Sequence, residues 1–64
     1  MPVIQISILP QTVEKKAEIA KTLTDEMHRM TNIPKDAFVI IFQEYPAESF
    51  ATHGELLSEQ FKKR

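Results

Sequence analysis

Few side chains in this 64-residue sequence could carry acid-base or metal chemistry. It has two histidines, His28 and His53, and no cysteine, so the usual ligands of a zinc cluster are absent. His28 flanks the apolar stripe of an expected helix and His53 falls in an expected hairpin, and both positions are typical of surface residues. The sequence therefore predicts no metal site, and neither histidine is favoured as an acid or a base.

Three charged residues could also contribute to binding or catalysis, although a structural role is favoured for each. Lys15 and Lys16 begin the expected helix, where free backbone N–H groups and the helix dipole can attract an anion such as a substrate carboxylate. The structural alternative is a solvated turn for Lys15 and an aliphatic stem beside the core for Lys16. Glu44 ends an expected strand, and strand C-termini often face sites in α/β proteins, although an acid role is the less favoured interpretation.

Two segments read as strands. In residues 3–9, Ile4, Ile6 and Ile8 share one face, and Pro10 ends the strand because proline has no N–H to donate. Residues 38–42 are an unbroken β-favouring run, as in a parallel strand covered on both faces. Beyond Glu44 we expect a short hairpin over residues 51–57, around His53 and Gly54, and then a charged tail.

Between the strands, residues 12 to about 32 have helical periodicity. Thr12 is the expected N-cap, Asn32 can take a left-handed C-terminal conformation, and Pro34 excludes the α region for the residue before it. The expected core positions are Val13, Ala17, Ile19, Ala20, Leu23, Met27 and Met30. On the solvated face, Asp25 and Arg29 are expected to pair at i,i+4.

These elements predict an α/β fold consisting of a single right-handed βαβ unit with parallel strands, plus the C-terminal hairpin, in one domain over residues 1–64. So short a chain buries only about 60% of its unfolded surface. One helix cannot cover both faces of a two-stranded sheet, so further copies must cover the second face. We expect a closed symmetric oligomer, with Tyr45 and Phe61 as contacts between subunits.

The overall charge excludes some partners. A formal net charge of −1 provides no field that would attract nucleic acid or anionic lipid. The longest apolar run is far shorter than a membrane span, and no signal peptide is visible, so we expect a cytoplasmic protein.

Five features together resemble the tautomerase superfamily, specifically its short-chain 4-oxalocrotonate tautomerase-like group. They are a proline directly after the initiator methionine, the strand PVIQISIL, the helix opening TVEKKAEIA, an apolar strand ending in Glu44, and Phe50 followed by Gly54-Glu55-Leu56. The resemblance covers nearly the whole chain. It implies a homohexamer of βαβ protomers, built as a trimer of dimers, that works as an isomerase without cofactor.

In that family the N-terminal proline is the catalytic base, which here is Pro2 once Met1 is removed. A free N-terminal proline is a secondary amine, and an apolar pocket favours its neutral form, which can move a proton on an enol or α-keto acid. With Met1 attached, the same nitrogen is an amide without basicity. The resemblance also places Phe50 in the aromatic pocket wall.

The sequence departs from the family at the two arginines that hold substrate carboxylates. Those positions read Gln11 or Thr12, depending on where a gap is placed, and Val39. No neutral residue replaces a guanidinium fork. We therefore expect a mono-acid enol such as phenylenolpyruvate as substrate, with backbone amides or Lys15 orienting its carboxylate. The alternatives are an oligomeric relative without meaningful catalysis, acting as a structural or ligand-binding assembly, and a small interaction module.

Overall fold

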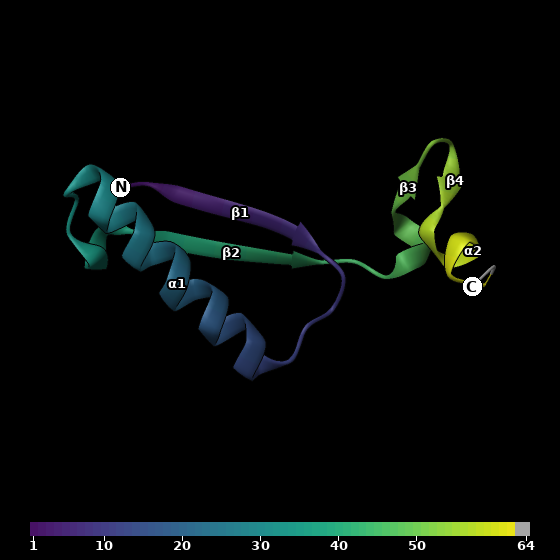
Figure 1. Ribbon diagram of the computed structural model, residues 1–64, viewed down its shortest axis with the longest axis horizontal. Helices are drawn as coiled ribbons and strands as arrows, with labels where there is room; N and C mark the ends of the chain where they lie inside the picture. The colour runs from purple at the N-terminus through teal and green to yellow at the C-terminus, as the bar shows by residue number, and fades with distance from the viewer. Residues whose placement is uncertain (63–64) are drawn as a thin grey trace.

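Two parallel strands and one long helix form the body of the molecule (Figure 1). The computed structural model describes residues 1–62. Strand β1 (Val3–Ile8) pairs in parallel with β2 (Val39–Glu44), in a register that runs from Val3 opposite Val39 to Ile8 opposite Glu44. Helix α1 (Val13–Thr31) makes the crossover between them. The predicted βαβ unit is confirmed.

The ends of α1 follow local signals. Thr12 is the N-cap, and its Oγ1 accepts the Lys15 N–H at 3.1 Å. At the other end Asn32 takes the left-handed conformation, with φ of 61°, and donates its N–H to the His28 carbonyl at 2.8 Å. Both ends were predicted, because each depends on residues within one helical turn.

The register sorts the sheet into two faces. Ile4 and Ile6 lie opposite Ile40 and Phe42, and all four are half-buried. Glu44 points to the same face of β2 as Ile40 and Phe42, because side chains alternate along a strand, and it meets the Lys16 side chain of α1. The face with these four apolar residues is therefore the one toward the helix. The opposite face carries Val3, Gln5, Ser7, Val39, Ile41 and Gln43. On it Ser7 donates a hydrogen bond to the Gln43 side chain at 3.1 Å.

The predicted core stripe of α1 is correct only in its middle. Ile19, Ala20, Leu23 and Met27 are half-buried, but Val13 is 74% exposed, Met30 is 61% exposed and Ala17 is exposed. Figure 1 shows α1 running obliquely to the strands. A sheet of two strands is narrower than the stripe, so the end residues of the stripe project beyond it in the protomer.

The predicted Asp25–Arg29 ion pair is wrong. Asp25 instead meets Lys21 at 2.9 Å and Lys35 at 3.0 Å, and these two lysines hold the pKa of the Asp25 carboxyl below its usual value. Lys35 belongs to η1 (Lys35–Ala37), a turn of 3-10 helix before β2. Arg29 turns toward Glu26 at 2.8 Å. Asp25 is therefore shared between a lysine one turn earlier on the same helix and a lysine of the following turn.

After β2 the chain forms an arm that extends away from the body (Figure 1). It consists of η2 (Ala47–Ser49), the antiparallel strands β3 (Ala51–Thr52) and β4 (Glu55–Leu56), and helix α2 (Leu57–Lys62). His53 and Gly54 both have positive φ, as the tight hairpin turn requires. The hairpin was predicted. Helix α2 was not predicted, because residues 58–61 were assigned no element between the hairpin and the expected charged tail over residues 62–64, of which 63–64 lie outside the described residues.

Within residues 1–62 of the isolated protomer, no side chain is fully buried. The radius of gyration is 15.1 Å, whereas a compact chain of this length has about 11 Å. The longest dimension is 44 Å and the shortest is 16 Å. The protomer alone therefore lacks a closed core, which is consistent with the expectation that further copies cover its apolar surface.

Candidate active site

Pro2 lies at the N-terminal edge of the sheet. It is half-buried, and its carbonyl accepts the Val39 N–H at 3.0 Å, which extends the ladder of β1 and β2 by one bond. Met1, which precedes it, is 89% exposed. The backbone bond fixes Pro2 against β2, while the position of Met1 leaves the Met1–Pro2 bond at the surface.

The position beside Pro2 is apolar. Val39, where the family pattern has an arginine, lies opposite Val3 in the register. Arg29 is in the last turn of α1 and forms a two-nitrogen contact with Glu26, at 2.8 and 3.2 Å. The other arginine, Arg64, lies outside the described residues. At this edge, the described residues provide no guanidinium that is not already paired.

A polar network lies at the opposite edge, where β2 ends. The Glu44 carboxylate accepts the backbone N–H of Gln11 at 2.8 Å and the Lys16 ammonium at 3.1 Å. The Gln11 hydrogen bond, followed by Lys16, holds the pKa of Glu44 below its usual value. These contacts favour the ionised form of Glu44, so they do not support an acid role, which stays a less favoured prediction. Its carboxylate fixes the loop before α1.

Lys15 lies in the same region but points into solvent. Its side chain is 55% exposed, and its ammonium lies 3.8 Å from Glu18. Its backbone N–H is used by the Thr12 cap. The structure therefore supports the solvated-turn interpretation within the protomer. A role of Lys15 toward a ligand stays a prediction.

Phe50 lies in the arm between η2 and β3, and its ring contacts that of Tyr45. The two rings meet edge to face, with centroids 5.9 Å apart and an interplanar angle of 75°. The Phe50 carbonyl accepts the Leu57 N–H at 2.8 Å, which ties the residue to α2. Phe50 is half-buried by these contacts.

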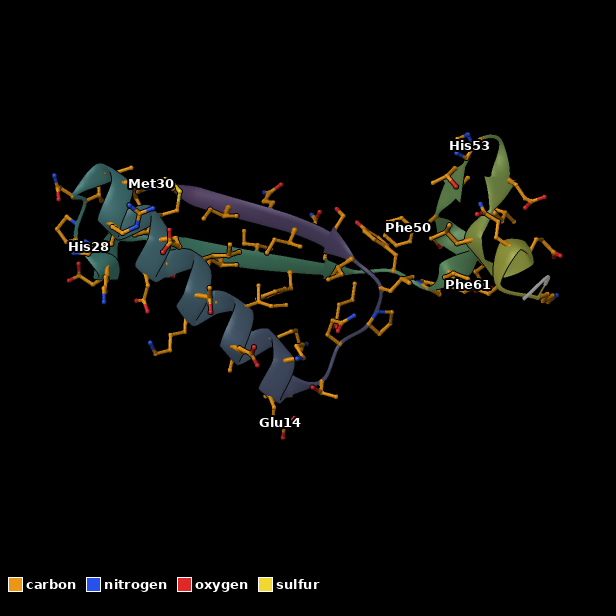
Figure 2. The ribbon with its side chains drawn as sticks, viewed as in Figure 1. Glu14, His28, Met30, Phe50, His53 and Phe61 are labelled. Carbon is orange, nitrogen blue, oxygen red and sulfur yellow. The ribbon has the colours of Figure 1, made fainter. Side chains whose placement is uncertain are left out.

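Pro2 and Phe50 lie at opposite ends of the sheet. Pro2 precedes β1, whereas Phe50 follows the far end of β2, as the termini in Figure 1 and the label in Figure 2 show. Six residues of β1 span ~20 Å. A surface hollow on α1, lined by Glu18, Ile19, Thr22 and Leu23, includes neither residue. One protomer does not bring the two predicted site residues together.

The histidines have local structural roles. His28 is half-buried, and its Nδ1 lies 2.8 Å from the Ile33 carbonyl, which ties the end of α1 to the next turn. His53 is exposed at the hairpin turn (Figure 2). Among residues 1–62, no three of the histidine and acidic side chains gather as a metal ion would require. No helix of that part of the chain is long and apolar enough to cross a membrane.

Two contacts were not predicted from the sequence: the Glu44 network and the Tyr45–Phe50 pair. The sequence did indicate the Glu44 network. Glu44 ends a strand parallel to β1, so it lies near the start of the crossover helix, where Lys16 is in the first turn. The sequence gave no indication of the Tyr45–Phe50 pair, because the path of the chain through Pro46 and η2 decides whether the rings meet.

The comparisons with known proteins agree with this architecture. The family model described as "Tautomerase enzyme" matches residues 2–60. A probable tautomerase of Streptococcus thermophilus (strain CNRZ 1066) is 28% identical over 57 residues, which cover 88% of this chain and 93% of that protein. The chain belongs to the tautomerase family, and a tautomerase type of function follows from that membership.

Two solved structures are similar over almost their whole length. A structure described under the 4-oxalocrotonate tautomerase isozymes of Methylibium petroleiphilum has a TM-score of 0.93 at 25% identity, and the match covers 98% of this chain and 100% of that one. A heterohexamer 4-oxalocrotonate tautomerase of Chloroflexus aurantiacus has a TM-score of 0.86 at 27% identity, covering 92% and 97%. The fold is that of the 4-oxalocrotonate tautomerases.

Proposed function

We propose that the protein is a cofactor-free keto-enol tautomerase in which Pro2, freed of Met1, is the general base. The observation that carries the proposal is the place of Pro2, directly after Met1 and half-buried at the sheet edge, in a chain whose family match begins at that residue. The exposed Met1 favours access of an aminopeptidase to the bond that must be cut.

The proposed reaction moves one proton and consumes nothing. The neutral Pro2 nitrogen takes the proton from the enol hydroxyl, the electron pair of that O–H bond forms the carbonyl, and the carbon-carbon π electrons take the proton back at carbon. Pro2 is half-buried, and its hydrogen-bonded neighbour Val39 is apolar, which supports the neutral amine because a desolvated ammonium is disfavoured.

The proposed site is shared between copies. Pro2 and Phe50 are ~20 Å apart along one protomer, farther than a small enol acid can reach. We therefore place Phe50 of one protomer beside Pro2 of another, in a closed homo-oligomer such as a homohexamer. The open core and the exposed Val3 and Ile41 support such an assembly.

For the substrate we propose a small enol or α-keto acid with a single carboxylate, such as phenylenolpyruvate. Because Val39 stands where the family has an arginine, the Pro2 edge lacks, among the described residues, the cation that would bind a second carboxylate, and a dicarboxylate is disfavoured. An aromatic substituent would pack against Phe50. The Gln11 side chain donates to the Leu9 carbonyl at 3.1 Å, and the Thr12 hydroxyl caps α1, so neither side chain replaces an arginine.

The second candidate function is a non-catalytic oligomer that binds a ligand or serves as a structural assembly. The observation that favours it is the absence of arginine at positions 11, 12 and 39. It predicts a stable assembly that does not turn over any enol acid, even when Met1 is removed.

The test combines intact mass with an ultraviolet assay of phenylenolpyruvate ketonisation on one sample. We expect a mass without methionine and measurable turnover. Pro2→Ala should lose about 10²- to 10⁴-fold in kcat, because its primary amine is differently basic and differently placed. A form that retains Met1 should be inactive. Full activity of Pro2→Ala would exclude this mechanism, and a processed but inactive protein would favour the second candidate.

A further inference from the structure

Tyr45 is held in a fixed place at the end of the sheet. It follows β2 directly, and its N–H donates to the Ile8 carbonyl at 3.1 Å, so its backbone continues the β1–β2 ladder. Pro46 follows, with φ of −71°. The direction in which the Tyr45 side chain leaves the sheet is therefore set by the ladder and not by a free loop.

Its ring is coupled to the proposed aromatic wall. The edge-to-face contact with Phe50, at 5.9 Å and 75°, joins the two side chains at the base of the arm. Phe50 is fixed in turn by hydrogen bonds to Ala47 and Leu57. The Tyr45 side chain remains 42% exposed, so a ligand that packs on Phe50 would also meet Tyr45.

The Tyr45 hydroxyl has no hydrogen-bond partner within residues 1–62, although it is both a donor and an acceptor. The two cations of this edge already have acidic partners. Lys16 lies 3.1 Å from Glu44, and Lys15 lies 3.8 Å from Glu18. The phenol, whose ring contacts Phe50, is thus a donor beside Phe50 that has no partner in the described part of the protomer.

We propose that the Tyr45 hydroxyl binds the single carboxylate of the substrate, as a neutral donor beside the Phe50 wall. This inference rests on the proposed function, since it deepens the same site. One O–H donor matches one carboxylate oxygen, whereas a guanidinium offers a bidentate fork. Tyr45 therefore adds a second reason for a monocarboxylate: a second carboxylate would have no matching donor.

The chain contains an independent probe of this contact. Tyr45 is its one tyrosine, and it has no tryptophan, so ultraviolet-excited emission near 300 nm comes from Tyr45 alone. Titration of the assembled protein with 4-methylpentanoate, which neither reacts nor absorbs there, should change this emission in a saturable way. The matched neutral probe, 4-methylpentanamide, should bind at least about tenfold more weakly, because hydrogen bonds to charged acceptors are stronger.

The second measurement is the kinetics of Tyr45→Phe. This variant keeps the ring and its Phe50 contact and removes only the hydroxyl. We expect KM for phenylenolpyruvate and the inhibition constant of 4-methylpentanoate to rise at least about tenfold, with kcat within about twofold, as for an interaction made equally in ground and transition states. Ser49→Ala removes the hydroxyl of the residue directly before Phe50 and leaves both rings in the chain, so it should match the wild type.

The outcomes separate this inference from the proposed function. Loss of activity in Pro2→Ala with an unchanged KM in Tyr45→Phe would overturn the role of Tyr45 and leave the tautomerase standing. An assembly without turnover would overturn the tautomerase, and the emission titration alone would then decide the carboxylate contact. Equal binding of the carboxylate and the amide, or no change in emission with either, would overturn the inference.

Discussion

The shared site predicts that two inactive variants restore each other. Pro2→Ala removes the base, and Phe50→Glu places a carboxylate where we propose that the substrate ring and carboxylate lie. If a site takes Pro2 from one chain and Phe50 from another, random mixing in equal amounts gives both intact residues at about one site in four, one half times one half. If one chain supplied both, no site in the mixture would be intact. The ~20 Å length of β1 is the structural reason for expecting the first result.

The assay is ketonisation of phenylenolpyruvate after the variants are co-refolded from denaturant. Each variant refolded alone gives the baseline, and each co-refolded with wild type shows that mixing itself does no harm. Sedimentation velocity checks that Phe50→Glu still assembles. Activity near a quarter of wild type supports the shared site. Activity no higher than the sum of the two baselines, in mixtures proven to contain both chains, would refute the reasoning.

Three further predictions concern stability and assembly. Asn32→Ala should lower the thermal midpoint in calorimetry by about 4–8 °C, because alanine in the left-handed conformation costs roughly 1 kcal/mol. Asn32→Gly should match the wild type, because glycine adopts this conformation freely. The pKa of Glu44 is lower in the folded protein than its unfolded value of 4.5, so the ionised carboxylate stabilises the fold above pH 4.5 and this stabilisation is lost as the pH falls through the folded pKa. In Glu44→Gln, the free energy of unfolding in urea should vary less with pH over that range. Ile41→Lys should raise the dissociation constant of the assembly by roughly 10³-fold or more in sedimentation, by placing an unpaired charge on the open sheet face, while the exposed Thr22→Lys on α1 should leave it unchanged.

The βαβ unit could be predicted because its signals are local. The alternation of Ile4, Ile6 and Ile8 sets β1. Thr12 caps the start of the helix and Asn32 caps its end, each through a hydrogen bond within one turn. The tight turn at His53 and Gly54 is equally local. Each of these depends on neighbours in sequence, which periodicity and turn chemistry describe well.

The errors arose where distant residues decide. Asp25 was expected to pair with Arg29, but it pairs with Lys21 on the preceding turn of α1 and with Lys35 from the turn after the helix. Met30 fits the apolar period, yet it projects past a sheet of only two strands. The separation of Pro2 from Phe50, in contrast, follows from the predicted parallel pairing, because one residue precedes β1 and the other follows β2.

The residues of the candidate site could be predicted from the sequence, but most of their arrangement in space could not. Pro2 and Phe50 came from family resemblance, and their roles stay predictions. The network of Glu44, Gln11 and Lys16 joins residues about thirty positions apart, and only the crossover of the fold brings them together. Tyr45 was expected at a subunit contact, and the edge contact with Phe50 is what gives it a different proposed role.

The lack of a buried side chain within residues 1–62 of the protomer has a kinetic consequence. A chain that closes its core only against other copies gains most of its stability in a bimolecular step. Refolding should then speed up as protein concentration rises, unlike that of a self-sufficient domain. In the cell, the local supply of identical newly made chains would set how fast the fold is completed, and dilute chains would be exposed to proteases for longer.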